Sequence, residues 1–500
     1  MPRPWHGSYS CSSWRLRCSY SGVPRAGCST GEKDRQYRRC KSMLLKRLIA
    51  TSLITAMSVG LIACSSSGTN STKEDNPNAA DSADDQPSSA GNKGDGKVVE
   101  VTYWHMWTSD WKKLIDSLVD EFNKSHPGIH VNALSITGDA NAKFLTAQAG
   151  GDPPDVMTQW NQIIPSWAKK GAIASLDPYI QADAPDIENW MYPTVRDIGK
   201  FDGHMYAIPF SMNSFAMFYN KDILTEEGFD ADNPPKTIEA LDAMQDKLWK
   251  TDSRGFIQRV GYMPSGLTMW SPSFGGKWAD QDGNPTATDP NNLKTLEWFQ
   301  SYAKKFDPKK VAAFNKSMSS NVNSAWPFLS GKQVFAMDGM WRLEDLKNYA
   351  PDLKYGITPL PYPEGSGKEN ATWVNGNFNI IPEKAKHPKE AWEFILWLTG
   401  YHNEDWAASM LTKGGWIPPS PIITEKQAYQ DFINEIPARK TFVELLGSPN
   451  AQITPVIPVQ QYYWDRAAKA EESVMTANKD PKEALENLQK EVEAEIAKDN

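Results

Sequence analysis

Several tryptophans, with asparagines and an arginine close to some of them in sequence, are the residues whose side chains are best suited to bind a ligand. Eighteen of the 20 tryptophans follow Lys97, and several fall where we predict loops or strand ends. A flat indole packs on the apolar C–H face of a pyranose, while amide and guanidinium groups bond its hydroxyls. Pockets of this kind are largely apolar with a few placed polar groups. The candidate ligand-binding residues are Trp104, Trp107, Trp160, Asn161, Asn213, Trp270, Trp341, Arg342, Trp373, Asn375 and Trp416.

Each of these tryptophans, taken alone, has a competing interpretation as a core residue, because aromatic side chains contribute much of the buried apolar surface. Trp111, Trp298 and Trp392 fall on predicted helices and are interpreted as packing residues. We expect at least three of the loop tryptophans to line one cleft. His105, next to Trp104, is interpreted as a supporting group rather than a ligand contact.

Enzyme signatures are weak in this sequence. It has no Gly-x-Ser-x-Gly, no His-Glu-x-x-His and no phosphate-binding loop. The segment 280–283 resembles part of a calcium loop, but Asn291 stands where a bidentate Glu is required. We therefore expect no catalytic residues, cofactor or metal. A glycoside hydrolase, which would also be Trp-rich and would use two carboxylates, stays open as an alternative. A structural adhesin would show repeats, and none is seen at a fixed period.

The segment around Cys64 has the features of an export signal. Lys46-Arg47 precede an apolar run over 48–62, which is short of the roughly 20 residues that span a membrane. The Leu61-Ile62-Ala63-Cys64 ending resembles the lipobox of bacterial lipoproteins. That resemblance implies cleavage before Cys64 and acylation of the new amino-terminal residue, which places the protein on the outer face of the cell membrane. More than one acyl chain gives stable anchoring.

We interpret residues 1–42 as an upstream extension and residues 43–63 as a signal peptide that starts at Met43. Residues 64–96 are interpreted as a lipidated tether. The extension holds four of the five cysteines without paired spacing and is interpreted as non-native. The tether has no aromatic residue, so it cannot bury enough apolar surface to fold. From Cys64 onward there are 42 basic and 59 acidic side chains. This acidic balance argues against binding nucleic acid.

Strand and helix patterns alternate in the first part of the folded region. Strands are predicted over 98–104, 130–136 and 155–160, with an amphipathic helix from Ser109 or Asp110 to Phe122 after the first. This alternation predicts an α/β fold with a mostly parallel sheet. Trp104, Trp107 and Trp160 follow strand ends, the edge at which such sheets bind ligands. Later helices are predicted over 237–250, 292–306, 388–399 and 481–498.

Four segments, taken together behind the lipobox, resemble the solute-binding lipoproteins of bacterial ABC importers, in the maltose-binding-protein-like carbohydrate class. They cover roughly 97–500, and their order and spacing, rather than any single string, carry the resemblance. They are 149–156 (AGGDPPDV), 203–210 (GHMYAIPF) with 218–222 (FYNKD), 328–341 (FLSGKQVFAMDGMW), and 373–376 (WVNG) with 384–398.

The resemblance implies two α/β lobes joined by crossover strands, with the ligand between them. Lobe 1 is expected to be 97–208 plus 330–377, and lobe 2 to be 214–326 plus 381–500. Hinges are expected at 209–213, 326–330 and 377–381. The implied function is that of a monomeric receptor. It is expected to capture a carbohydrate, in particular an oligosaccharide, and to deliver it to a membrane permease. A non-sugar solute such as a polyol or polyol phosphate is a further alternative.

Overall fold

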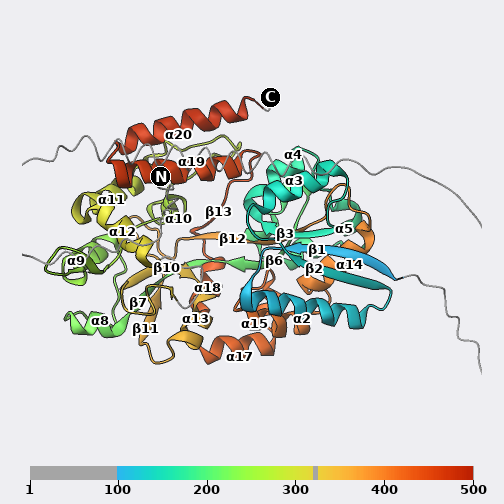
Figure 1. Ribbon diagram of the computed structural model, residues 1–500, viewed down its shortest axis with the longest axis horizontal. Helices are drawn as coiled ribbons and strands as arrows, with labels where there is room; N and C mark the ends of the chain where they lie inside the picture. Colours follow the sequence, from blue (N-terminus) through green and yellow to red (C-terminus); the bar gives the residue numbers. More distant parts are fainter. Residues whose placement is uncertain (1–97, 319–324, 499–500) are drawn as a thin grey trace, which may run out of the picture. The chain divides into compact units, whose positions relative to one another are not determined.

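The computed structural model describes residues 98–318 and 325–498 and contains two main β-sheets (Figure 1). The expectations for 1–42, 43–63, Cys64 and the 64–96 tether lie outside the described residues. None of the helices in the described ranges has the length and apolar character needed to cross a membrane. Those ranges also contain no cluster of three or more His, Cys, Asp or Glu side chains suited to a metal ion.

The larger sheet has six strands in the order β13-β12-β3-β1-β2, with β6 also paired to β12. β1 is parallel to β2 and β3, whereas β12 runs antiparallel to β3 and β6. The three strands expected first are therefore confirmed, and β12 makes the sheet mixed rather than mostly parallel. The strands are β1 (Val99–His105), β2 (Ile129–Ser135), β3 (Val156–Trp160), β6 (Ile208–Asn213), β12 (Thr372–Ile380) and β13 (Ala451–Ile453).

Helix α2 (Ser109–Ser125) shows how the helices are held on this sheet. Its Ile115, Leu118, Val119 and Phe122 recur at helical spacing and are all buried. Each such burial contributes about 1.5–3 kcal/mol. Helix α14 (Pro388–Thr399) packs against α2, β1 and β6 and ends at Gly400, whose φ of 82° suits glycine. Figure 1 shows α2 on the opposite side of the sheet from α3 and α4.

The remaining elements around the larger sheet are short helices and one small hairpin. Together with β1, β2, β3, β6, α2 and α14 they form what we call the larger-sheet lobe. They are α3 (Ala140–Gly150), η1 (Asn161–Ile163), α4 (Ile164–Lys169), α5 (Asp177–Asp183), α6 (Ile187–Trp190), α7 (Pro193–Arg196), β4 (Lys200–Phe201), β5 (His204–Met205), α15 (Glu404–Gly414), α16 (Pro421–Thr424) and α17 (Gln427–Glu435).

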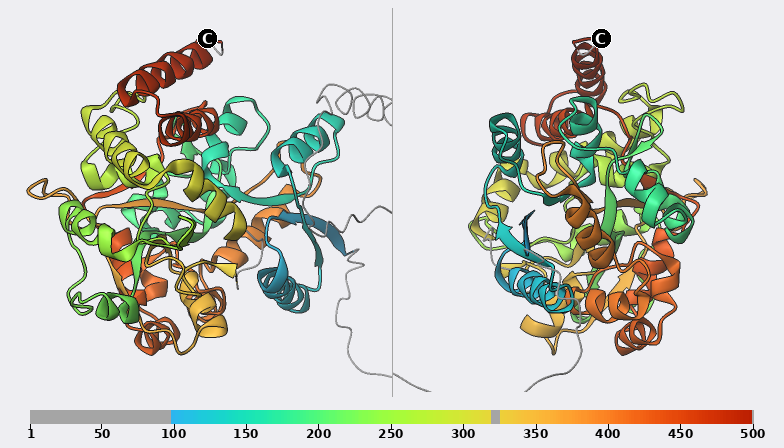
Figure 2. Two further views of the ribbon diagram at one scale, coloured as in Figure 1. Left: turned by 60° about the vertical axis from the view of Figure 1, so that its left-hand side comes forward. Right: turned by 90° about the vertical axis from the view of Figure 1, so that its right-hand side faces the viewer.

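The smaller sheet has the antiparallel order β10-β7-β11, and with its helices it forms the smaller-sheet lobe. Figure 2 shows the C-terminal pair α19 and α20 lying together beside α11. Its elements are β7 (Phe215–Asn220), α8 (Lys221–Glu226), α9 (Ile238–Leu248), β8 (Lys250–Thr251), β9 (Ile257–Arg259), α10 (Leu267–Phe274), α11 (Pro290–Phe306), α12 (Pro308–Met318), β10 (Phe335–Gly339), α13 (Arg342–Tyr349), β11 (Tyr355–Thr358), α19 (Gln460–Ala477) and α20 (Pro481–Ile496).

Two of the expected lobe boundaries are wrong. β10 and β11, expected in lobe 1 within 330–377, pair with β7 of the smaller sheet. Conversely α14, expected in lobe 2 within 381–500, packs on the larger sheet. The segment 326–330, expected as a hinge, packs through Trp326 and Phe328 on Phe218 of β7. The reason for the strand error is that β10 and β11 pair with β7, which is distant from both in sequence, and local patterns do not encode such pairing.

Three segments run between the lobes: the step from β6 to β7, strand β12, and the stretch from β13 to α19. All nine residues of β12 are buried. Its pairing with β6 shifts register between Asn377 and Phe378, as at a β-bulge. Helix α18 (Arg439–Leu446) packs on both β7 and β12 at this junction. β12 is therefore the element on which a site between the lobes is centred.

Candidate functional site

Three predicted asparagines meet around the middle of β12. Asn213 of β6 lies opposite Asn375, and its Nδ2 donates to Asn375 Oδ1 at 2.9 Å. The backbone N–H of Gly376 donates to Asn161 Oδ1 at 3.4 Å, so the amide at the end of β3 reaches the same point. A Cβ added at Gly376 would lie 2.6 Å from the Ser211 carbonyl oxygen, so only glycine permits this close approach.

A row of aromatic rings extends from these asparagines into the smaller-sheet lobe. Trp341 meets Phe215 edge-on at 5.9 Å between ring centroids, and Phe215 stacks on Trp373 at 5.8 Å. Trp373 in turn lies 6.2 Å from Trp464 of α19. Trp373 is buried, and its Nε1 donates to Thr454 Oγ1. Trp341 and Trp464 stay partly exposed, so the row has two accessible ends.

Trp160 is the accessible ring of the larger-sheet lobe. Among the tryptophans of 98–318 and 325–498 it alone is exposed, at 44 % of its surface. It ends β3, and its register partner is Asn377 on β12. Trp160 therefore keeps a large flat surface open beside the buried polar groups of β12, and its contact with a ligand stays a prediction.

Trp270 is a correction to the expected site. It was expected in a loop because residues 264–276 are rich in Pro, Ser and Gly, but Leu267–Phe274 forms α10. Its side chain is fully buried, donates from Nε1 to Tyr262 Oη at 2.8 Å, and packs on Trp298. Glu471 stabilises this short helix by accepting from the backbone N–H of Leu267 at 2.7 Å. Trp270 belongs to the core of the smaller-sheet lobe.

Trp107 and Trp416 are also core residues. Their rings lie 5.6 Å apart, and both pack edge-on against Phe210 of β6. Trp104 is half-buried and packs against the same core. Trp107 and Trp416 are buried because the larger sheet needs apolar cover at the end of β1, so the prediction that these two rings form platforms is wrong. For Trp104, which is partly exposed, a contact with a ligand stays a prediction.

His105 lies in the same core, between the rings of Tyr103 and Trp107. It is 1 % exposed, and neither ring nitrogen has a hydrogen-bond partner in the described chain. Burial lowers the pKa of His105 to about 4; Asp116 opposes the shift and Lys112 adds to it. The ring is therefore neutral at physiological pH.

Arg342 is held by carboxylates at the start of α13. Its Nε donates to Asp338 Oδ2 at 2.7 Å and its Nη1 to Asp345 Oδ2 at 2.9 Å, while the guanidinium lies over the Trp326 ring. Burial alone would lower the pKa of Arg342, but the two carboxylates outweigh it and hold the pKa above its ordinary value. Arg342 thus fixes α13 directly after Trp341, with part of its hydrogen-bonding capacity already used.

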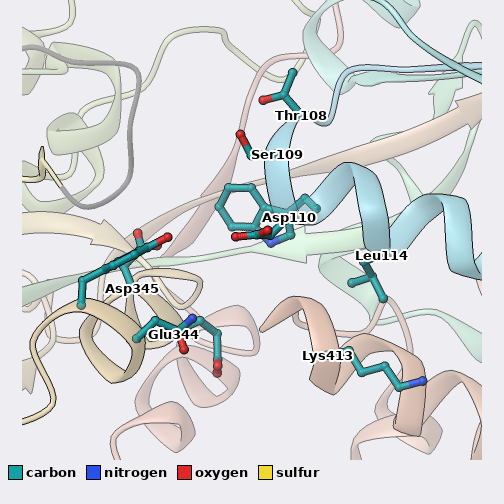
Figure 3. Close-up of a pocket in the computed structure, with 10 residues that line it drawn as sticks. Thr108, Ser109, Asp110, Leu114, Glu344, Asp345 and Lys413 are labelled. Carbon is teal, nitrogen blue, oxygen red and sulfur yellow. The ribbon is translucent and has the colours of Figure 1, made fainter.

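A pocket of about 220 Å³ lies between the start of α2 and helix α13, and so between the two lobes (Figure 3). Thr108, Ser109 and Asp110 line it from the C-terminal end of β1, where open α/β sheets place ligands. Figure 3 shows Glu344 and Asp345 on the facing side and Lys413 on a third element, α15. The other lining residues are Trp111, Leu114, Asn348 and Tyr349.

The carboxylates of this pocket are neutralised by cations of their own. Asp110 pairs with Lys113 at 2.9 Å, Asp345 with Arg342, and Glu344 with Arg439 at 2.5 Å. Arg439 of α18 is fully buried and also donates to Glu435 of α17 at 3.0 Å. Because Glu344 belongs to the smaller-sheet lobe and Glu435 to the larger, this guanidinium ties the lobes together at the pocket floor.

The structure adds site residues that sequence reasoning missed. Phe215, Trp464 and the 108–110 segment were not among the candidates. The 108–110 segment directly follows the predicted strand end, so extending the strand-end rule by a few residues would have found it. Trp464 carries a weaker signal, the run Tyr462-Tyr463-Trp464 after two prolines. Phe215 has no local signal, since its role follows from stacking on a strand that is far away in sequence.

Carboxyl groups with raised pKa values lie elsewhere. Burial raises the pKa of Asp242 and of Glu471, although hydrogen bonds oppose the shift in both. Asp242 accepts from Tyr302 Oη at 2.6 Å and Trp298 Nε1 at 3.0 Å within the smaller-sheet core. Neither group lines the pocket between α2 and α13 or belongs to the aromatic row.

Comparison with known proteins places this geometry in context. Residues 117–437 match the family model described as bacterial extracellular solute-binding protein. The chain is 24 % identical over 409 residues to the maltotriose-binding protein of Pyrococcus abyssi, covering 81 % of this chain and 83 % of that protein. It is also 24 % identical to the sn-glycerol-3-phosphate-binding periplasmic protein of Agrobacterium fabrum, covering 78 % and 91 %.

Solved structures show the same architecture. CpMnBP1 with mannotriose bound is 30 % identical, with a TM-score of 0.71, covering 79 % of this chain and 99 % of that one. The substrate-binding protein Lmo0181 of Listeria monocytogenes, in complex with cycloalternan, is 21 % identical with a TM-score of 0.68 and covers 80 % and 100 %. The latter likeness concerns the fold alone.

Proposed function

Because the chain belongs to the bacterial extracellular solute-binding protein family, we propose that it captures an oligosaccharide between its lobes and delivers it to the permease of an ABC importer. The observation that carries the proposal is the meeting, at the crossing strand β12, of buried asparagines with accessible indoles. Trp160 comes from one lobe and Trp341 and Trp464 from the other. This is the mixture of flat apolar surface and fixed amides that a sugar ring requires.

Binding is coupled to closure in this proposal. A ligand that touches Trp160 and the aromatic row at the same time has contacts that exist only when the lobes approach, so it shifts the population toward the closed form. The permease distinguishes the closed form from the open one. The pocket between α2 and α13 extends the same interlobe surface and offers Thr108, Asn348 and Lys413 to further hydroxyl groups.

The anchor is the second part of the proposal. Acylated Cys64 holds the protein on the outer face of the cell membrane through a tether over 65–96, and the receptor acts as a monomer. Mass spectrometry of membrane-extracted protein tests this directly, since an amino-terminal peptide beginning at diacylated Cys64 is expected. An unmodified Cys64 peptide would overturn the anchor and leave the binding proposal intact.

Two other functions compete with sugar capture. Relatives that bind sn-glycerol-3-phosphate favour a polyol phosphate. A lipid-anchored hydrolase would cleave its ligand, but the carboxyl groups with raised pKa values, Asp242 and Glu471, bond structural partners away from the site. The test is tryptophan fluorescence during titration with mannotriose and maltotriose, followed by chromatography of the recovered sugar. A fluorescence change with intact sugar is expected, and cleaved sugar would favour the hydrolase.

A further inference from the structure

Helix α19 carries two consecutive glutamines in opposite situations. Gln461 donates from Nε2 to Asp465 Oδ1 at 2.9 Å, one turn along the helix surface. Gln460 is 1 % exposed, and neither its Oε1 nor its Nε2 has a hydrogen-bond partner in the described chain. An unpaired buried amide costs about 1–3 kcal/mol for each group, so such a residue needs an explanation.

Two further unpaired atoms lie close to Gln460. Trp464 is four residues on, and therefore on the same helix face, and its buried Nε1 has no partner among the described residues. The buried Oε1 of Gln162 in η1 also has no hydrogen-bond partner among the described residues. Helix α19 contacts both η1 and α4, and Figure 1 shows that it starts at the end nearest α4. The unpaired atoms therefore belong to two elements, α19 of one lobe and η1 of the other, that contact each other.

This seam adjoins the site described above. Gln162 is two residues beyond Trp160, the exposed platform, and Trp464 forms the accessible end of the aromatic row. In the arrangement that the structure shows, the Gln460 amide, the Gln162 carbonyl oxygen and the Trp464 indole N–H are unpaired, so a guest that pairs them makes this arrangement more favourable.

The chemistry of the set defines the guest. It offers two donors, Gln460 Nε2 and Trp464 Nε1, and two acceptors, the Oε1 atoms of Gln460 and Gln162. Two neighbouring hydroxyl groups match this set, because each hydroxyl donates one hydrogen bond and accepts another. A phosphate dianion offers acceptors only and would leave both carbonyl oxygens unpaired. The cation nearest in sequence, Arg466, is already paired with Glu491.

We propose that Gln460, Gln162 and Trp464 form the hydroxyl-recognition part of the site and take a vicinal diol of the ligand. The inference rests on the proposed function and narrows it to a ligand that presents two neighbouring hydroxyl groups to this seam. It also makes Gln460 a specificity-determining residue, since a site built to bond hydroxyls rejects ligands that cannot complete its hydrogen bonds.

The test compares Gln460→Leu with Gln461→Leu, its neighbour in the chain. Calorimetric titration with mannotriose and maltotriose should show at least a tenfold loss of affinity in Q460L. The melting temperature of ligand-free Q460L should equal or exceed that of wild type, because an unpaired buried amide has been removed. Q461L should match wild type in both measurements. Trp464→Phe, which keeps the ring and removes the N–H, should lose affinity about fivefold.

The outcomes separate this inference from the proposed function. Wild-type affinity in Q460L, or a Q460L melting temperature several degrees below wild type, overturns the inference while the sugar-binding function stands. A wild type that binds none of a panel of oligosaccharides overturns the proposed function, and this inference with it.

Discussion

The two lobes divide their tryptophans between core and site by different rules. In the larger-sheet lobe the accessible ring, Trp160, stands at a strand end, where parallel strands bring their C-terminal residues to one edge. In the smaller-sheet lobe the accessible rings come from a helix start, Trp341, and from a helix face, Trp464. The difference shows that loop composition alone does not determine which tryptophans stay exposed, since strand ends, helix starts and helix faces all contribute one.

The largest expected loss of stability is at Trp270, which we assign to the core of the smaller-sheet lobe. This side chain is fully buried and hydrogen-bonded to Tyr262, so Trp270→Ala should lower the free energy of unfolding by about 3–5 kcal/mol. Urea denaturation followed by circular dichroism measures the loss. At temperatures where the variant is folded, its sugar affinity should equal that of wild type. A stable variant that has lost affinity would return Trp270 to the site and refute the core assignment.

Arg439 tests how the lobes are joined. Replacing it with Met removes the shared cation and leaves Glu344 without its partner, while Glu435 keeps its ion pair with Lys347, at a cost of about 3 kcal/mol in unfolding free energy. Lys440→Met, at the exposed neighbouring position, should change stability by less than about 0.5 kcal/mol. If both variants unfold at the same denaturant concentration, Arg439 contributes nothing to the junction.

Protonation of His105, in the larger-sheet lobe, should make the free energy of unfolding depend on pH. Its pKa is lowered in the folded state from the ordinary 6.5 to about 4, so between these values the unfolded chain binds more protons. Stability is therefore complete above pH 6.5 and falls as the pH is lowered toward 4, by up to about 3 kcal/mol.

The matched variant is His105→Phe, which keeps a flat ring and cannot be protonated. Melting temperatures measured between pH 7 and pH 4 should fall less steeply for this variant than for wild type. Parallel profiles would mean that the imidazole is not the group responsible.

The smallest change in unfolding free energy is expected at Trp160, the exposed tryptophan that we propose as a ligand contact of the larger-sheet lobe. Trp160→Ala should weaken oligosaccharide binding by about 1–3 kcal/mol and leave the unfolding free energy within about 0.5 kcal/mol of wild type. Phe256→Ala is the control, since Phe256 is 58 % exposed and lies on the β9 side of the smaller-sheet lobe. Equal affinity in both variants would remove Trp160 from the site.

Elements set by local pattern were predictable from the sequence. The 3.6-residue spacing of apolar side chains located α2, α9, α11, α14 and α20, and the first three strands followed from their apolar runs. The smaller sheet was not predictable, because β7, β10 and β11 come from three distant segments. Their pairing depends on contacts that no local window contains.

Some positions of the proposed site were located from the sequence, although their contact with a ligand stays a prediction. Trp160 and Asn161 lie at the end of β3 as expected, Asn213 lies in the hinge predicted over 209–213, and Asn375 lies opposite it. Trp270 was misplaced because a Pro- and Ser-rich segment folded as a helix that Glu471 caps from α19. Trp464 and Gln460 were missed because their significance depends on neighbours in the other lobe.

The interrupted register of β12 has a mechanical consequence. A bulge bends and twists its strand locally, and here that place is the step from Asn377 to Phe378. Strand β3 pairs with β12 in regular register across the same step, so the step is held inside the larger-sheet lobe. We therefore expect any change in the angle between the lobes to occur outside this step, because rotation at the step itself would break the pairing with β3.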